Sequence, residues 1–139
     1  MEKTILASMF YLLTASSNIF ANDSIFSGGL EFKLSDEKHV NQYKRSIEKN
    51  DGIYQGLIVT NEMLNIKGIV SGGIIIKTTE VDSLSFKDSS MSVVKIGGGY
   101  WLLKYKLGTE MNEKLAWIKG QSGVQSAEIE VIKNIQNPN

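Results

Sequence analysis

The sequence predicts an α+β domain in which two helices cover one face of an antiparallel sheet. In each of two stretches, an alternating strand pattern gives way to helical spacing. The clearer stretch is 98–132, where the apolar period changes from two to 3.6 and back to two. The other is 30–49. Between them lie β-branched runs separated by glycine, a pattern typical of hairpins.

Residues 1–21 have the features of a secretory signal peptide. Lys3 precedes an apolar run over 5–13, and small and polar residues follow up to Ala21. The run is shorter than the roughly 20 apolar residues of a spanning helix, so we expect cleavage near Ala21 and no permanent membrane anchor. A buried amphipathic N-terminal helix is the alternative. The mature protein would then be one domain, 22–139, in the periplasm or secreted.

The first strand-helix unit follows this segment. Residues 22–27 are expected to form a polar leader, and 30–34 alternate apolar and charged, which predicts a strand with one wet face. Ser35 or Asp36 can cap a helix that continues to about Lys49. We therefore expect the first helix directly after the first strand.

The middle of the chain is expected to consist of strands. The segments share β-branched or aromatic side chains and glycine or polar boundaries: 53–60, 63–70, 74–79, 92–96 and 100–107. Ser-Gly-Gly at 71–73 predicts an extra hairpin between the second and third of them. Gly-Gly-Gly at 97–99 predicts another between the last two, because a tight turn needs positive φ.

The strand over 100–107 has two different faces. Trp101 and Leu103 are expected on the core side, which places Tyr100 and Leu102 on the opposite side. An apolar group there is a candidate partner surface.

The second helix and the last strand follow. Thr109 is expected as the N-cap, and Met111, Leu115 and Ile118 form the apolar stripe. In the final strand, apolar residues at 127, 129 and 131 alternate with Glu128 and Glu130. Together these elements predict a ferredoxin-like sandwich, β-α-β-β-α-β, with an extra β-hairpin.

The composition excludes several functions. The chain has no cysteine, which removes disulfides and thiolate metal sites, and its 15 basic and 15 acidic residues give no nucleic-acid-binding surface. His39 is the only histidine and no Gly-x-Ser-x-Gly motif is present, so we expect neither an enzyme nor a cofactor or metal. A solvated helix position is the ordinary explanation for His39.

Three other groups of residues have ordinary structural explanations. Glu128 and Glu130, and likewise Glu80 and Asp82, could bind a cation, but alternating acids on a strand are usually solvated. The glycines at 97–99 lie between strands, where a hairpin turn is more plausible than a phosphate site. The two tryptophans, at 101 and 117, could stack on a ligand but have the spacing of core residues.

Residues 98–132 resemble the C-terminal half of the propeptide domains of subtilisin-like and kexin-like serine proteases. The matching features are Tyr-Trp-Leu-Leu-Lys-Tyr at 100–105, Leu-Ala-Trp-Ile at 115–118 and Gly-Val-Gln-Ser-Ala-Glu at 123–128. In that family the propeptide lays its sheet on the protease and runs its C-terminal tail through the active-site cleft. We expect no protease domain to follow these residues, and the resemblance then implies a stand-alone secreted chaperone or inhibitor, similar to the external chaperones of some bacterial kexin-like proteases.

The resemblance also assigns the partner-binding tail, which would enter the cleft of a subtilisin/kexin-like protease: Lys133, Asn134, Ile135, Gln136, Asn137, Pro138 and Asn139. A frayed C-terminus is the alternative for these residues. For the whole protein, two alternatives stay open. One is a periplasmic interaction or immunity-type protein that binds another partner through its exposed sheet face, and the other is a small hydrolase or ligand-binding protein.

Overall fold

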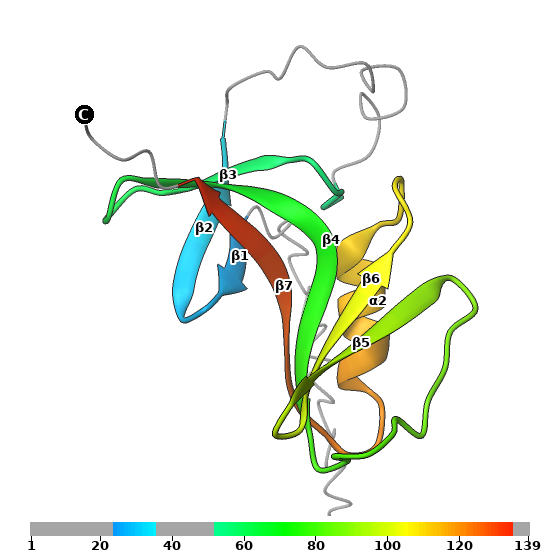
Figure 1. Ribbon diagram of the computed structural model, residues 1–139. Coiled ribbons are helices and arrows are strands. Elements are labelled where there is room, and N and C mark those ends of the chain that lie inside the picture. The colour runs from blue at the N-terminus through cyan, green and yellow to red at the C-terminus, as the bar shows by residue number, and fades with distance from the viewer. Residues whose placement is uncertain (1–23, 36–51, 135–139) are drawn as a thin grey trace, which may run out of the picture.

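The computed structural model describes residues 24–35 and 52–134, which form seven antiparallel strands and one helix (Figure 1). The elements in chain order are β1 (Ser24–Ser27), β2 (Leu30–Leu34), β3 (Ile58–Asn61), β4 (Ile66–Thr78), β5 (Met91–Gly97), β6 (Tyr100–Tyr105), α2 (Met111–Lys119) and β7 (Val124–Asn134).

Strand β4 is the centre of the sheet. Its first residues, 66–69, pair with β3, and its later residues, 73–77, pair with β6. Along the other edge it pairs with β7 from Lys67 to Thr78. The sheet continues through β3 to the β2–β1 hairpin and through β6 to β5, which among the described strands pairs with β6 alone. Most of the long-range structure therefore depends on one 13-residue strand.

Residues 71–73 form a bulge within β4, and the expected hairpin over these residues is wrong. The register against β7 shifts between Val70 and Ile74, while the strand itself continues. Gly72 has φ +83°, and a Cβ there would meet the Gln55 side chain. A Cβ at Gly73 would lie 2.7 Å from a methyl carbon of Leu102. Glycine is needed here for close packing inside a bent strand.

The β1–β2 hairpin packs against β7. Its turn uses Gly28 and Gly29 at φ +58° and +77°. The Ser27 hydroxyl accepts a hydrogen bond from the Val131 N–H at 3.2 Å, and the Gly28 N–H donates to Glu128 Oε2 at 2.9 Å. The expectation of a polar leader over 22–27 is therefore wrong for Ser24–Ser27, which is strand β1.

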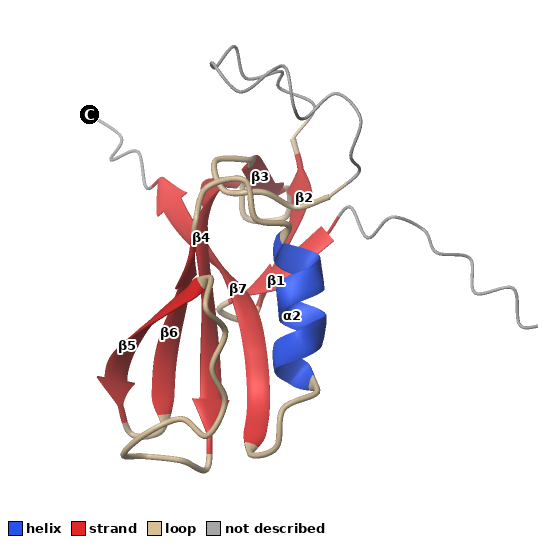
Figure 2. Cartoon of the chain, turned by 90° about the vertical axis from the view of Figure 1, so that its right-hand side faces the viewer, coloured by secondary structure: helices blue, strands red, loops and turns tan. Residues whose placement is uncertain are grey.

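Helix α2 covers one side of the sheet and helps to close the core (Figure 2). Met111 and Ile118 are fully buried, together with side chains from β2, β4, β6 and β7. Trp101 is buried, and its Nε1–H donates to the Glu80 carbonyl at 3.0 Å. The helix is capped by Glu110 rather than by Thr109, because the Glu110 carboxylate accepts from the backbone of residues 112 and 113.

The prediction of a ferredoxin-like sandwich with two helices on one face is wrong. The described residues hold a seven-stranded sheet with one short helix, and every strand pairing in it is antiparallel. The β1–β2 hairpin and the undivided β4 supply strand pairings that the ferredoxin-like topology does not contain. The first expected helix, up to Lys49, the signal segment 1–21 and His39 all lie outside the described residues.

Candidate functional site

The face of the sheet opposite α2 has a continuous cross-strand row of side chains. Val94 of β5 pairs with Leu102 of β6, which pairs with Ile75 of β4, which pairs with Glu128 of β7. Leu102 and Ile75 are half-buried and Val94 is 43% exposed. We call this surface the open face. Three apolar residues lie side by side in this row, which makes it a candidate protein-binding surface.

The neighbouring row extends the open face towards the β5–β6 turn. Tyr100 pairs with Lys77, whose Nζ lies 5.3 Å from the centroid of the Tyr100 ring. Tyr100 is 41% exposed, while Trp101 and Leu103 beside it are buried on the α2 side. The strand alternation therefore predicted this face correctly.

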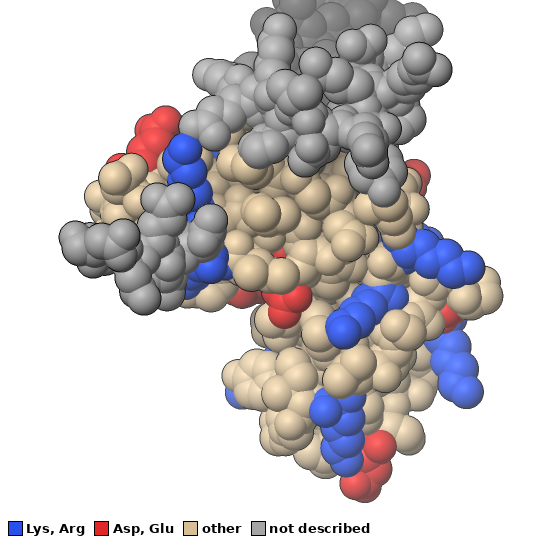
Figure 3. Space-filling model, turned by 45° about the horizontal axis from the view of Figure 1, so that its top comes forward, with Lys and Arg blue, Asp and Glu red and all other residues tan. Residues whose placement is uncertain are grey.

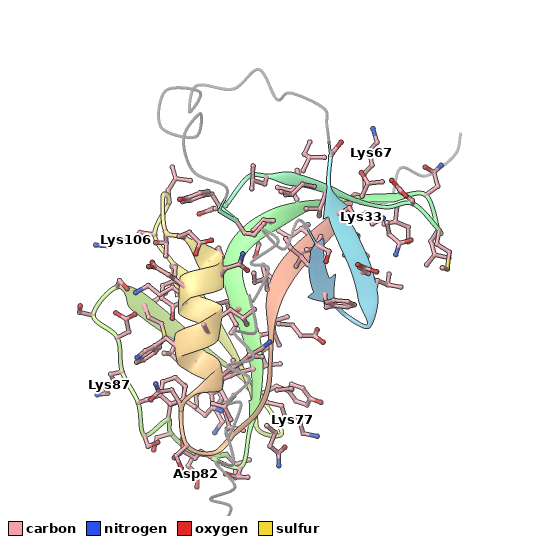
Figure 4. All side chains as sticks on the ribbon, turned by 180° about the vertical axis from the view of Figure 1, so that it is seen from behind. Lys33, Lys67, Lys77, Asp82, Lys87 and Lys106 are labelled. Carbon is pink, nitrogen blue, oxygen red and sulfur yellow. The ribbon has the colours of Figure 1, made fainter. Side chains whose placement is uncertain are left out.

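The open face continues past the bulge. Ile58, Ile69 and Ile132 pair across β3, β4 and β7, and the last two are largely exposed. The next row consists of Lys33, Thr60, Lys67 and Asn134 on β2, β3, β4 and β7. Figure 4 shows Lys33 and Lys67 at this end of the sheet. The sequence pattern did not reveal this half of the face, because it depends on the register of distant strands.

The expected partner-binding tail begins at this same end. Lys133 is an exposed residue of β7, and Asn134 is the last residue of that strand, opposite Lys67. Ile135, Gln136, Asn137, Pro138 and Asn139 lie outside the described residues. The described part of this segment thus ends in the row of Lys67, next to the row of Ile69 and Ile132.

The carboxylates form no metal centre in the part of the chain that the structure describes. Glu128 accepts a hydrogen bond from the Gly28 N–H. Glu130 lies next to Gly73, because a Cβ added to that glycine would be 3.5 Å from one Glu130 carboxylate oxygen. Glu80 accepts from the Ser85 N–H. Figure 3 shows lysines and carboxylates scattered over a face made mostly of other residue types. In 24–35 and 52–134 no helix is long and apolar enough to cross a membrane.

The α2 side of the molecule carries one well-defined ion pair. The Ser90 backbone N–H and, next, the Lys114 ammonium lower the pKa of Asp88 to about 2. Lys114 Nζ lies 2.9 Å from Asp88 Oδ2 and 5.5 Å from the centroid of the Tyr105 ring. Burial raises the pKa of Tyr105 to about 12, with a smaller contribution from Asp88. These groups hold the 79–90 connection to the helix, away from the open face.

Comparison with known proteins identifies the family. The sequence matches the family model described as the open reading frame 2 N-terminal domain over residues 8–138, and the chain therefore belongs to that family. Among solved structures, the fold is similar to a chain in the crystal structure of the Aeromonas sobria serine protease (ASP) and chaperone (ORF2) complex. The TM-score is 0.50 at 18% identity, over 84% of this chain and 99% of that chain. The search among curated proteins found no match.

Proposed function

We propose that this protein is a secreted chaperone that binds a subtilisin/kexin-like serine protease and assists its folding. One observation carries the proposal. The family model and the chaperone in the similar complex share the designation ORF2, and the match extends over nearly the whole of a chain in that complex. The propeptide-like pattern at 98–132 supports the same partner, and a binding role needs no catalytic group in this chain.

The open face supplies the main contact area in this proposal. Four of its residues, Ile69, Val94, Tyr100 and Ile132, are each more than 40% exposed in the free domain. Burial of apolar surface is the main favourable contribution to most protein–protein association. A surface that binds the native protease, or its folding transition state, more tightly than the unfolded chain favours folding by mass action. The same contact gives chaperone activity without any chemical step.

The C-terminal tail supplies inhibition. An extended segment that starts at Lys133 and Asn134 can add a strand to the cleft of the protease through main-chain hydrogen bonds. Residues 135–139 reach at most about 17 Å beyond Asn134. The cleft must therefore face the end of β7.

Capture of the partner tests the proposed function. The mature chain, 22–139, is immobilised and incubated with periplasmic and secreted extract of its own source, and bound proteins are identified by mass. Recovery of a subtilisin-like or kexin-like protease is the expected result. A different captured protein, or none, would contradict the proposal, and a non-protease partner would favour the immunity-type alternative.

Truncation tests the role of the tail separately. Removal of 135–139 keeps Asn134 opposite Lys67, so we expect an unchanged unfolding midpoint and at least a tenfold loss of inhibition of the captured protease. A matched control replaces 135–139 by glycine and serine at the same length. If main-chain hydrogen bonds carry the binding, this control keeps part of the inhibition. Equal inhibition by the truncated and intact proteins would refute the role of the tail.

A further inference from the structure

The turn between β3 and β4 presents two apolar side chains to solvent. Met63 is 91% exposed and Leu64 is 54% exposed. Both lie at the tip of the hairpin formed by Ile58–Asn61 and the start of β4. Their side chains contribute nothing to the core, and an apolar pair at a loop tip costs solubility.

The tip is built as a fixed structure. The Asn61 side chain is buried, its Nδ2 donates to the Glu31 carbonyl at 2.9 Å, and its Oδ1 accepts from the Leu64 N–H at 2.7 Å. Asn65 closes the turn at φ +52°, a conformation that asparagine tolerates. A turn whose backbone is fixed before binding loses less backbone entropy when it binds.

The tip also lies beside the start of the tail. Asn134 pairs with Lys67, and Met63 and Leu64 are only three to four residues before Lys67 along the chain. The turn at 62–65 therefore extends beyond Asn134 at the same end of the sheet. Any surface that receives the tail is thus brought next to the tip.

We propose that Met63 and Leu64 form an apolar peg that enters an apolar depression on the protease, beside the cleft that takes the tail. This inference rests on the proposed function and adds a third contact to it. The charges around the tip favour a protein over a lipid surface. Three lysines (Lys33, Lys67, Lys133) and two glutamates (Glu31, Glu62) lie on the strands and turn at this end of the sheet, and Lys33 Nζ lies 3.9 Å from Glu62 Oε2. An excess of one basic residue is far below the clusters of about four to eight that bind anionic lipids.

Affinity measurements on paired variants test the peg. Met63→Ser with Leu64→Ser in the chain 22–139 is compared with Val81→Ser and Leu107→Ser, two exposed apolar residues remote from this turn. The probe is the serine protease captured by the wild-type chain. We expect roughly a 10- to 100-fold increase in Kd for the peg variant and less than a twofold change for the control, with both unfolding midpoints near that of the wild type.

A cross-link then identifies what the tip touches. The chain has no cysteine, so Met63→Cys gives a single attachment point for a thiol-reactive photo-cross-linker, and Val81→Cys is its control. A cross-link from position 63 to the protease, absent from position 81, supports the peg. A product with a second copy of the chain, or insertion into anionic phosphatidylserine vesicles without a product on the protease, overturns it.

Failure of the proposed function can be distinguished from failure of the peg alone. If the wild-type chain captures no serine protease, the proposed function and the peg fall together. If the wild type binds the protease and the Met63→Ser, Leu64→Ser variant binds it equally well, only the peg is refuted.

Discussion

Two neighbouring valines on β5 provide a direct test of the open face. Val93 and Val94 are exposed to nearly the same degree, 42% and 43%, but they lie on opposite faces of the same edge strand. Val94 is in the row with Leu102, and Val93 is paired with the buried Leu103. We expect Val94→Glu to weaken binding to the captured protease strongly and Val93→Glu to leave it nearly unchanged.

The expected size follows from the structure. Replacing valine by glutamate on an edge strand lowers β-propensity by at most about 1 kcal/mol, and this loss is common to both variants. Only at position 94 is the carboxylate buried when the open face is covered. An interfacial charge without a partner costs several kcal/mol, and about 1.4 kcal/mol corresponds to a tenfold change in Kd. We therefore expect at least a 30-fold difference in Kd between the two variants.

Urea unfolding first confirms that both variants fold. The protease is then titrated with each variant, and binding is measured from the residual protease activity or by calorimetry. Similar stabilities with a large difference in Kd would locate the interface on the open face. Equal Kd values for Val94→Glu and Val93→Glu would refute this reasoning, and weaker binding by Val93→Glu alone would move the interface to the α2 side.

Two further predictions concern the domain itself. Ile129 is 1% exposed and pairs with Ile74, so Ile129→Ala should lower the free energy of unfolding by about 2–5 kcal/mol in urea titrations; a loss under 1 kcal/mol would contradict the packing described for β7. The pKa of Asp88 is lowered to about 2 from 3.8, so its stabilising contribution is complete above about pH 5 and is lost as the pH falls towards 2. Thermal unfolding of Asp88→Asn should accordingly change less between pH 5 and pH 2 than that of the wild type, and parallel curves would argue against the contribution of Asp88.

The last third of the chain could be predicted from sequence because its elements are locally amphipathic. The alternation around Trp101, the helical spacing of Met111 and Ile118, and the alternation around Ile129 each predicted an element that the structure contains. In these segments, the period of the apolar residues identifies both the element and the face that it buries.

The errors arose where a distant residue decides a local structure. Ser-Gly-Gly at 71–73 is compatible with a turn as well as with a bulge. The bulge is accompanied by close packing of the Gln55 side chain against Gly72 and of the Leu102 side chain against Gly73, which the local sequence does not show. The cap at Glu110 rather than Thr109 has a similar cause. One Glu110 oxygen also accepts from the Ile53 N–H at 2.8 Å, and the Met111 N–H donates to the Ile53 carbonyl, neither of which is visible in the local sequence.

The candidate site could be predicted only in part. Alternation predicts Tyr100 and Leu102 on one face without any knowledge of the sheet. The continuation through Ile69 and Ile132 requires the β4–β7 register, which is set by pairings between residues 46 to 67 positions apart. The proposed peg at Met63 has no sequence signal, because the sequence alone does not show that a methionine in a turn is exposed. Its significance depends on the buried Asn61 that fixes the turn.

The arrangement of these surfaces limits the kind of partner that can use all of them. Asn134 lies six residue steps after Glu128 in β7, which is about 20 Å of strand, and 135–139 add up to about 17 Å. A short peptide would cover one row of the open face or meet the tail, but it would not reach both. A folded domain with a flat apolar area next to a groove can do so. Because the open face and the proposed peg belong to one sheet and the tail continues from β7, each additional contact after the first is effectively intramolecular. Weak contributions from the open face, the proposed tail contact and the proposed peg would then combine into tight binding. Loss of any one of them would lower the total affinity.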